Sequence, residues 1–216
     1  MTMLEKMGDF FDARLAGYEE HMMTCILGAE EFYPFTAECL PKDGRILDLG
    51  CGTGLELNYY FPSAPDASVI GIDLAPAMLE ELGKKFPHRD LTLICGSYFD
   101  VPLGEGCFDA AVSVESLHHF TLEEKVPLYR KLHQSLKEGG FFILTDYFSL
   151  SEEEEAMHRR ELLRLKAEEG LSDDEFYHYD TPLTVEHEIC ALGRGGFSKT
   201  EILNAWGATH TLKAYK

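Results

Sequence analysis

The length of 216 residues suits a single domain, and the 45% of hydrophobic residues can bury a substantial core. The 38 acidic residues outnumber the 19 lysines and arginines, and the formal net charge of −19 disfavours nucleic acids and anionic membranes as partners. The six cysteines form no CxxC pair and no stretch resembles a signal peptide or a membrane span, so we expect a cytoplasmic protein with reduced thiols and no membrane partner.

The first two thirds of the chain alternate between apolar runs and amphipathic stretches. Residues 1–40 are predicted to be helical, and their aromatic side chains, Tyr18 among them, suit a cap over the rest of the domain. Buried strands are predicted at 45–49, 68–73, 91–95, 108–114 and 140–147, because these runs are rich in Val, Ile, Leu and Phe. Helices are predicted at 55–61, 76–86 and 122–136, the last stopped by Gly139 and Gly140. The alternation predicts an α/β fold with a doubly wound, mostly parallel sheet.

The last third departs from this alternation. Ser151 is predicted to cap an acid-rich helix that runs to Glu169 and stops at Gly170. Two apolar segments, 197–203 and 209–215, flank a turn at Gly207 and predict an antiparallel hairpin. The predicted organisation is one domain with a helical cap (1–40), a cofactor-binding core (45–147), a helical lid (151–180) and a terminal hairpin (197–215).

The most informative stretch is a glycine-rich loop after the first predicted strand. Gly50, Gly52 and Gly54 allow a tight turn and let a ligand approach the backbone closely. Asp73 ends the next strand, where doubly wound folds hold ribose hydroxyls. Dinucleotides and S-adenosylmethionine both fit this pattern. Asp48, on the strand before the loop, would repel a pyrophosphate but attract an ammonium or sulfonium cation, which favours S-adenosylmethionine.

With these motifs the sequence resembles the class I S-adenosylmethionine-dependent methyltransferases of the small-molecule type, over about residues 45–147. The matching segments are Leu47–Gly54 (glycine-rich motif), Gly71–Leu74 (acidic motif), Cys95–Pro102 (adenine-side loop), Phe108–Phe120 (strand ending in Leu-His-His-Phe) and Leu136–Tyr147 (following strand). The resemblance implies a seven-stranded sheet with an antiparallel last strand.

The resemblance also implies S-adenosylmethionine as the cofactor. The implied cofactor-binding residues are Asp48, Gly50, Cys51, Gly52, Gly54, Asp73, Leu74, Met78, Ser97, Tyr98 and Val114. Two positions depart from the family pattern. Ser97 replaces the aspartate that usually accepts a hydrogen bond from the adenine amino group, and Glu138 replaces a proline at a helix end.

Methyl transfer from a sulfonium is an in-line displacement, for which proximity and orientation supply about 7–11 kcal/mol. A base is needed only when the acceptor must first lose a proton, so the catalytic residue is left unknown. The candidates for the pocket are Tyr18, Glu115, His119, Asp146 and Tyr147. Adjacent His118 and His119 are expected to project in different directions, and no third ligand has suitable spacing, so no metal is predicted.

Three functions stay open at this point. The first is methyl transfer to a small molecule by a monomer or homodimer, and the second is methylation of RNA or protein. The third is a cofactor-binding protein with lost or altered catalysis, because a glycine loop indicates binding rather than turnover. The acidic charge and the lack of a basic patch favour the first and argue against nucleic acid as a partner.

Overall fold

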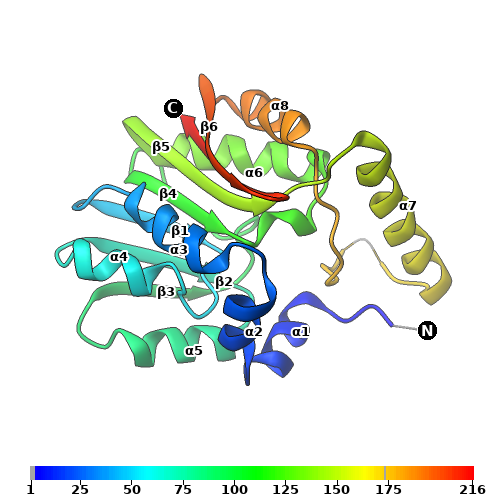
Figure 1. Ribbon diagram of the computed structural model, residues 1–216, viewed down its shortest axis with the longest axis horizontal. Coiled ribbons are helices and arrows are strands. Elements are labelled where there is room, and N and C mark those ends of the chain that lie inside the picture. The colour runs from blue at the N-terminus through cyan, green and yellow to red at the C-terminus, as the bar shows by residue number, and fades with distance from the viewer. Residues whose placement is uncertain (1–2, 173) are drawn as a thin grey trace.

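The computed structural model describes residues 3–172 and 174–216, so residues 1–2 of the predicted cap and residue 173 of the predicted lid lie outside the described residues. A seven-stranded sheet with the order β3-β2-β1-β4-β5-β7-β6 forms the centre of the molecule (Figure 1). The strands are β1 (Arg45–Leu49), β2 (Ser68–Asp73), β3 (Asp90–Cys95), β4 (Phe108–Val114), β5 (Leu136–Tyr147), β6 (Lys199–Trp206) and β7 (Thr209–Tyr215). Strand β7 runs antiparallel to β5 and β6, and the others are parallel, which confirms the predicted fold class.

Helices cover both faces of the sheet (Figure 1). They are α1 (Met7–Arg14), α2 (Tyr18–Cys25), α3 (Ala29–Glu38), α4 (Leu57–Ser63), α5 (Pro76–Lys85), α6 (Leu122–Ser135), α7 (Glu152–Glu169) and α8 (Val185–Gly195). Side chains of α3, α4 and α5 form one apolar core with the sheet, and those of α6 and α8 form a second core. In the part of the chain that the structure describes, no helix has both the length and the apolar character needed to cross a membrane.

The predicted helix over 122–136 and strand over 140–147 are wrong at their shared boundary. Helix α6 ends at Ser135, and β5 begins at Leu136 because Leu136 pairs with Phe108 of β4. Gly139 and Gly140 therefore lie inside a strand, and they do not stop a helix. This pairing joins residues far apart in sequence, so local pattern alone does not reveal it.

Smaller differences between predicted and observed bounds occur at the ends of other helices and strands. Helix α4 spans Leu57–Ser63 instead of 55–61, because turns of the glycine loop extend to residue 56. Helix α5 ends one residue early, at Lys85, and β3 begins one residue early, at Asp90. Strand β6 covers Lys199–Trp206 instead of 197–203, because its pairing with β7 continues to the turn at Gly207.

Helix α7 follows the sequence prediction closely. Ser151 Oγ accepts a hydrogen bond from the backbone N–H of Glu154 at 3.2 Å, and Gly170 closes the helix with a φ of 64°. No side chain of α7 is buried, and the helix projects from the body of the molecule beside the N-terminal segment (Figure 1). The helix therefore contributes little to the core.

Helix α8 was not predicted, and a buried ion pair holds it against α6. Lys125 Nζ of α6 lies 2.5 Å from Glu188 Oε2 of α8, and both side chains are buried. The Tyr129 hydroxyl donates a second hydrogen bond to Glu188. A charged residue, Glu188, therefore lies on the buried face of α8, on the same side as Ala191 and Leu192.

Candidate functional site

The glycine loop follows β1 at the point where the strand order reverses between β1 and β4. Open α/β sheets bind ligands at such a point, beyond the carboxyl ends of the strands. Gly50, Gly52 and Gly54 have φ values of 72°, 48° and 70°, which disfavour residues with a Cβ. A Cβ on Gly50 would also overlap the hydroxyl of Ser116, which follows β4. Glycine at this position lets the two loops approach each other.

Asp73 ties the end of β2 to this loop. Its Oδ2 accepts a hydrogen bond from the N–H of Gly52 at 2.8 Å, and its Oδ1 accepts one from the N–H of Ala75 at 2.8 Å. The pKa of Asp73 is raised above its usual value, because the effect of burial exceeds the opposite effect of the backbone N–H donors. Each oxygen retains a lone pair, so the carboxylate can still accept hydrogen bonds from a ligand.

Two buried carboxyl groups, Asp48 and Glu56, face each other beneath the loop. Burial, followed by the charge of Glu56, raises the pKa of Asp48 well above its usual range, and burial also raises the pKa of Glu56. Apart from a proton that the two carboxyl groups can share, Asp48 Oδ2 and Glu56 Oε1 have no hydrogen-bond partner among the residues that the structure describes. Buried carboxyl oxygens without partners are costly, and a positively charged ligand group beside them would remove that cost.

A small cavity opens over the glycine loop, and we call it the loop cavity. It is lined by Met7, Phe11, Tyr18, Gly50, Gly52, Asp73, Leu74, Met78, Tyr98, Glu115, Ser116 and His119. Six of the residues implied by the resemblance line it directly: Gly50, Gly52, Asp73, Leu74, Met78 and Tyr98. The other five, Asp48, Cys51, Gly54, Ser97 and Val114, lie outside its lining. Ser97 Oγ accepts a hydrogen bond from the N–H of Phe99 at 3.1 Å.

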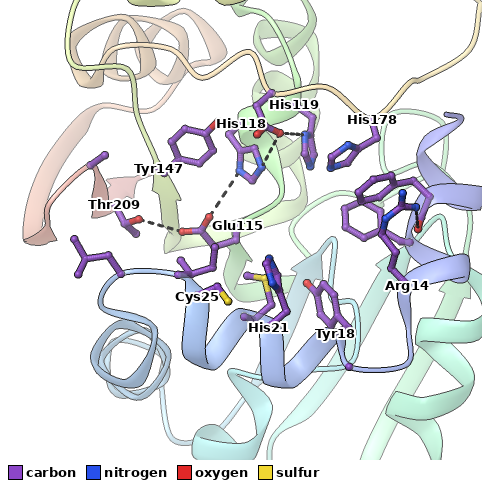
Figure 2. A pocket seen from close by; sticks show the side chains of 18 of the residues that line it. Arg14, Tyr18, His21, Cys25, Glu115, His118, His119, Tyr147, His178 and Thr209 are labelled. Carbon is purple, nitrogen blue, oxygen red and sulfur yellow. Dashed lines mark hydrogen bonds and ion pairs between the residues drawn. The ribbon is translucent and has the colours of Figure 1, made fainter. Parts of the chain in front are cut away.

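A second cavity of about 850 Å³ adjoins the first, and we call it the aromatic cavity. Its walls include Phe10, Phe11, Tyr18, Tyr147 and Trp206. Helices α1 and α2 form one side, and the turn after β4, the end of β5 and the segment before α8 form the other, with Glu115 between them (Figure 2). Four residues line both cavities: Phe11, Tyr18, Glu115 and His119. A ligand in one cavity would therefore meet a ligand in the other at these side chains.

Glu115 has an unusual backbone at this junction. Its φ is 48°, a left-handed conformation that costs a non-glycine residue about 1–3 kcal/mol and is typical of functional sites. Its side chain is only 6% exposed and accepts a hydrogen bond from the Thr209 hydroxyl at 3.3 Å (Figure 2). Burial and the nearby charge of Asp146 raise the pKa of Glu115 to about 8. The fold therefore holds a buried carboxyl group against both cavities.

Asp146 orients His118 from behind the cavity wall. Its Oδ1 lies 2.5 Å from His118 Nδ1, and its Oδ2 accepts a hydrogen bond from the N–H of Leu117 at 2.9 Å. Burial lowers the pKa of His118, but the charge and hydrogen bond of Asp146, together with the charges of Asp180 and Glu115, outweigh burial and raise the pKa to about 9. Asp146 does not line either cavity, whereas Tyr147 lines the aromatic cavity.

The expectation that His118 and His119 diverge is wrong. Both lie on a short 3₁₀ turn, Leu117–His119, which brings their ring centroids within 4.1 Å. Asp180 then approaches both rings, with its Oδ1 3.0 Å from His119 Nδ1 and 3.7 Å from His118 Nε2. Burial and the charge of His118 lower the pKa of His119. A third candidate ligand therefore joins the two histidines.

Sequence reasoning missed several residues that line these cavities. They are Met7, Phe11, Ser116, His178, Asp180 and Thr209. Asp180 and Thr209 come from the chain after β5, where no motif marks them. Ser116 could have been found, because it directly follows Glu115 at the end of a predicted strand.

Comparisons with known proteins show similarity to methyltransferases. Residues 47–144 match the family model of a methyltransferase domain. An uncharacterised methyltransferase of Synechocystis is 32% identical over 121 residues, which make up 55% of each chain. A tRNA (carboxymethyluridine(34)-5-O)-methyltransferase of Xenopus tropicalis is 26% identical over 177 residues, which make up 81% of this chain and 26% of that protein.

A solved structure of another protein is similar in fold to this chain. The S-adenosylmethionine-dependent methyltransferase from Mesorhizobium loti matches with a TM-score of 0.62 at 22% identity, covering 85% of this chain and 96% of that one. The likeness at this identity shows a shared fold. The chain spans only about half, or less, of the length of the Synechocystis and Xenopus relatives.

Proposed function

Because the chain belongs to the class I S-adenosylmethionine-dependent methyltransferases, we propose that it transfers the methyl group of this cofactor to a small acceptor in the aromatic cavity. The observation that carries the proposal is the junction of the two cavities at Phe11, Tyr18, Glu115 and His119. A cofactor over the glycine loop would present its methyl group there, and an acceptor would meet it from the other side.

The residues around the loop cavity fit S-adenosylmethionine. The buried carboxyl groups of Asp48 and Glu56 lie outside the cavity lining, and they favour a positively charged methionine end near them. Gly50 and Gly52 leave the backbone open to close approach, and Asp73 can accept hydrogen bonds from ribose hydroxyls. When bound, the cofactor supplies a sulfonium-activated methyl group, and transfer is a displacement that depends on alignment.

The aromatic cavity supports a small, neutral or cationic acceptor. Its aromatic walls suit a partly apolar molecule, and its acidic groups, Glu115 and Asp180, suit an N–H or O–H donor. We assign Glu115 the role of accepting a hydrogen bond from the acceptor, so that the acceptor's lone pair faces the methyl group. The strained backbone of Glu115 and its place at the junction support this role.

Above pH 8, where Glu115 with its pKa of about 8 is ionised, Glu115→Gln is expected to lower kcat/KM for the acceptor by about 10- to 100-fold, the effect of losing a charged hydrogen bond worth about 1.5–3 kcal/mol. Below about pH 7 the carboxyl group is mostly protonated, and the effect should be smaller. The measurement is S-adenosylhomocysteine formation with a panel of small aromatic and aliphatic amines and phenols. Cofactor affinity should change less than about threefold, since the loop cavity keeps its glycines and Asp73. Glu115→Gly, which relieves the positive φ, should be equally impaired.

Glu138→Gln serves as the matched control, because this acidic side chain is 97% exposed and remote from both cavities. Unchanged turnover in Glu115→Gln would contradict the role of Glu115. Methylation of tRNA or peptides, with none of the small acceptors methylated, would contradict the proposed acceptor class.

The similarity to a tRNA-methylating protein of Xenopus tropicalis makes RNA the second candidate acceptor. With a net charge of −19, the chain should meet polyanions unfavourably, because binding to nucleic acid depends on lysine and arginine neutralising phosphates. We expect no measurable affinity for tRNA in gel-shift assays near physiological salt. Tight binding that weakens steeply with added salt would move RNA methylation to first place.

A further inference from the structure

Three possible metal ligands converge at the wall of the aromatic cavity: His118, His119 and Asp180. Their ligand atoms all lie within 4.8 Å of one another, and they come from two segments about 60 residues apart, the turn after β4 and the segment before α8. We propose that these three residues bind one divalent transition-metal cation of the zinc type, with one coordination position open to the cavity.

The distances suit a tetrahedral ion. Zinc binds histidine nitrogen and carboxylate oxygen at about 2.0–2.2 Å, which places neighbouring ligand atoms of a tetrahedron about 3.3 Å apart. Asp180 Oδ1 lies 3.0 Å from His119 Nδ1 and 3.7 Å from His118 Nε2, on either side of that value. Two histidines and one carboxylate also make up the donor set of several catalytic zinc sites.

A supporting hydrogen bond orients the first ligand. His118 Nδ1 binds Asp146 at 2.5 Å, which turns Nε2 toward Asp180. Metal-binding histidines usually bond a carboxylate through the other ring nitrogen in this way. Asp146 itself is held by the backbone N–H groups of Leu117 and Tyr147, at 2.9 and 3.0 Å. Asp146 is therefore a support for the ligand set and not a member of it.

The cation would face the cavity. His118 and His119 are buried at the cavity wall, whereas the side chain of Asp180 is 42% exposed and also lines the cavity. Among the described residues, the ion pairs of Asp180 are with these two histidines. If the proposed methyl transfer is correct, an acceptor hydroxyl would supply the fourth ligand, because its oxygen keeps a lone pair for the methyl group after binding the cation. That consequence rests on the proposed function, but the metal site does not.

The test uses the full chain without an affinity tag, stripped of metal and titrated with Zn²⁺ against a chromophoric chelator. We expect one Zn²⁺ per chain, and Co²⁺ should give the intense visible absorption of a tetrahedral site. Asp180→Asn and His119→Gln should each weaken Zn²⁺ binding by about 100-fold or more, and Asp146→Asn by about 10- to 100-fold.

His187→Gln is the matched control, because His187 also pairs with a carboxylate, Glu155 at 2.8 Å, but without a second histidine. Its Zn²⁺ affinity should equal that of the unaltered chain. As a check on folding, Zn²⁺ should raise the melting temperature of His187→Gln but not that of Asp180→Asn. The proposal is overturned if the unaltered chain binds no Zn²⁺, or if Asp180→Asn and His119→Gln bind it equally well. Because neither cofactor nor acceptor is present, this outcome is separate from a failure to transfer methyl groups.

Discussion

Lys125→Met is expected to lower the free energy of unfolding by about 3–5 kcal/mol, because it leaves the carboxylate of Glu188 buried without its counter-ion. Both charged side chains are at most 2% exposed, so water cannot replace the lost ammonium group. Domains have a total stability of only about 5–15 kcal/mol, and the change would remove a large part of it. The pair joins α6 to α8, so the loss should also loosen the segment that leads to Asp180.

Urea unfolding followed by circular dichroism would measure this loss. Lys137→Met is the matched control: Lys137 pairs with Asp109 at 2.7 Å, but both side chains are about one third or more exposed, so the loss should be at most about 1 kcal/mol. In Lys125→Met with Glu188→Gln, the neutral amide can still accept the bond from Tyr129, and most of the stability should return. A cost of less than about 1 kcal/mol for Lys125→Met alone would contradict the argument.

Asp73→Ala is expected to weaken S-adenosylmethionine binding by about 10- to 100-fold. Hydrogen bonds to a charged group contribute about 1.5–3 kcal/mol, and the variant loses those that the carboxylate would make to the ribose. It also loses the bond that holds the N–H of Gly52 at 2.8 Å, so the glycine loop is less well ordered before the cofactor binds. Both effects act in the same direction.

Isothermal titration calorimetry with S-adenosylmethionine would check this prediction. Asp73→Asn separates the two effects in part: its amide oxygen can still accept the hydrogen bond of the Gly52 N–H without a charge, but its NH2 group then faces the N–H of Ala75. Asp90→Ala, at the start of the neighbouring strand β3, is the control and should bind the cofactor normally. A dissociation constant unchanged in Asp73→Ala would mean that the ribose lies elsewhere.

The strands and the glycine loop could be predicted because each depends on consecutive residues. Three of the five strands predicted before residue 150 match to the residue, namely β1, β2 and β4. Each is a short apolar run that its neighbours bury on both faces, and such a run needs no distant information. The loop residues Gly50 and Gly52 and the acidic Asp73 likewise follow directly from their positions after β1 and β2.

Four pocket candidates of the sequence analysis line the aromatic cavity, namely Tyr18, Glu115, His119 and Tyr147, but the rest of that cavity could not be predicted in the same way. Asp180 meets His118 and His119 only because the segment before α8 folds back against the turn after β4, where the Thr181 N–H donates to the His118 carbonyl at 2.8 Å. Helix α8 was missed although Thr184 precedes it as an N-cap and Gly196 ends it; only Glu188 interrupts its apolar face. Contacts made across long stretches of chain, with polar residues at buried positions, leave no periodic signal.

The position of β7 has a consequence for the order in which the protein can assemble. Strand β7 lies between β5 and β6 and supplies the pairing partner of β6, although it is synthesised after both. The glycine loop can meet Asp73 while the rest of the chain is still on the ribosome. Glu115 obtains the hydrogen bond of Thr209 only when the first residue of β7 has emerged. A nascent chain should therefore complete the glycine loop before it completes the junction of the two cavities at Glu115.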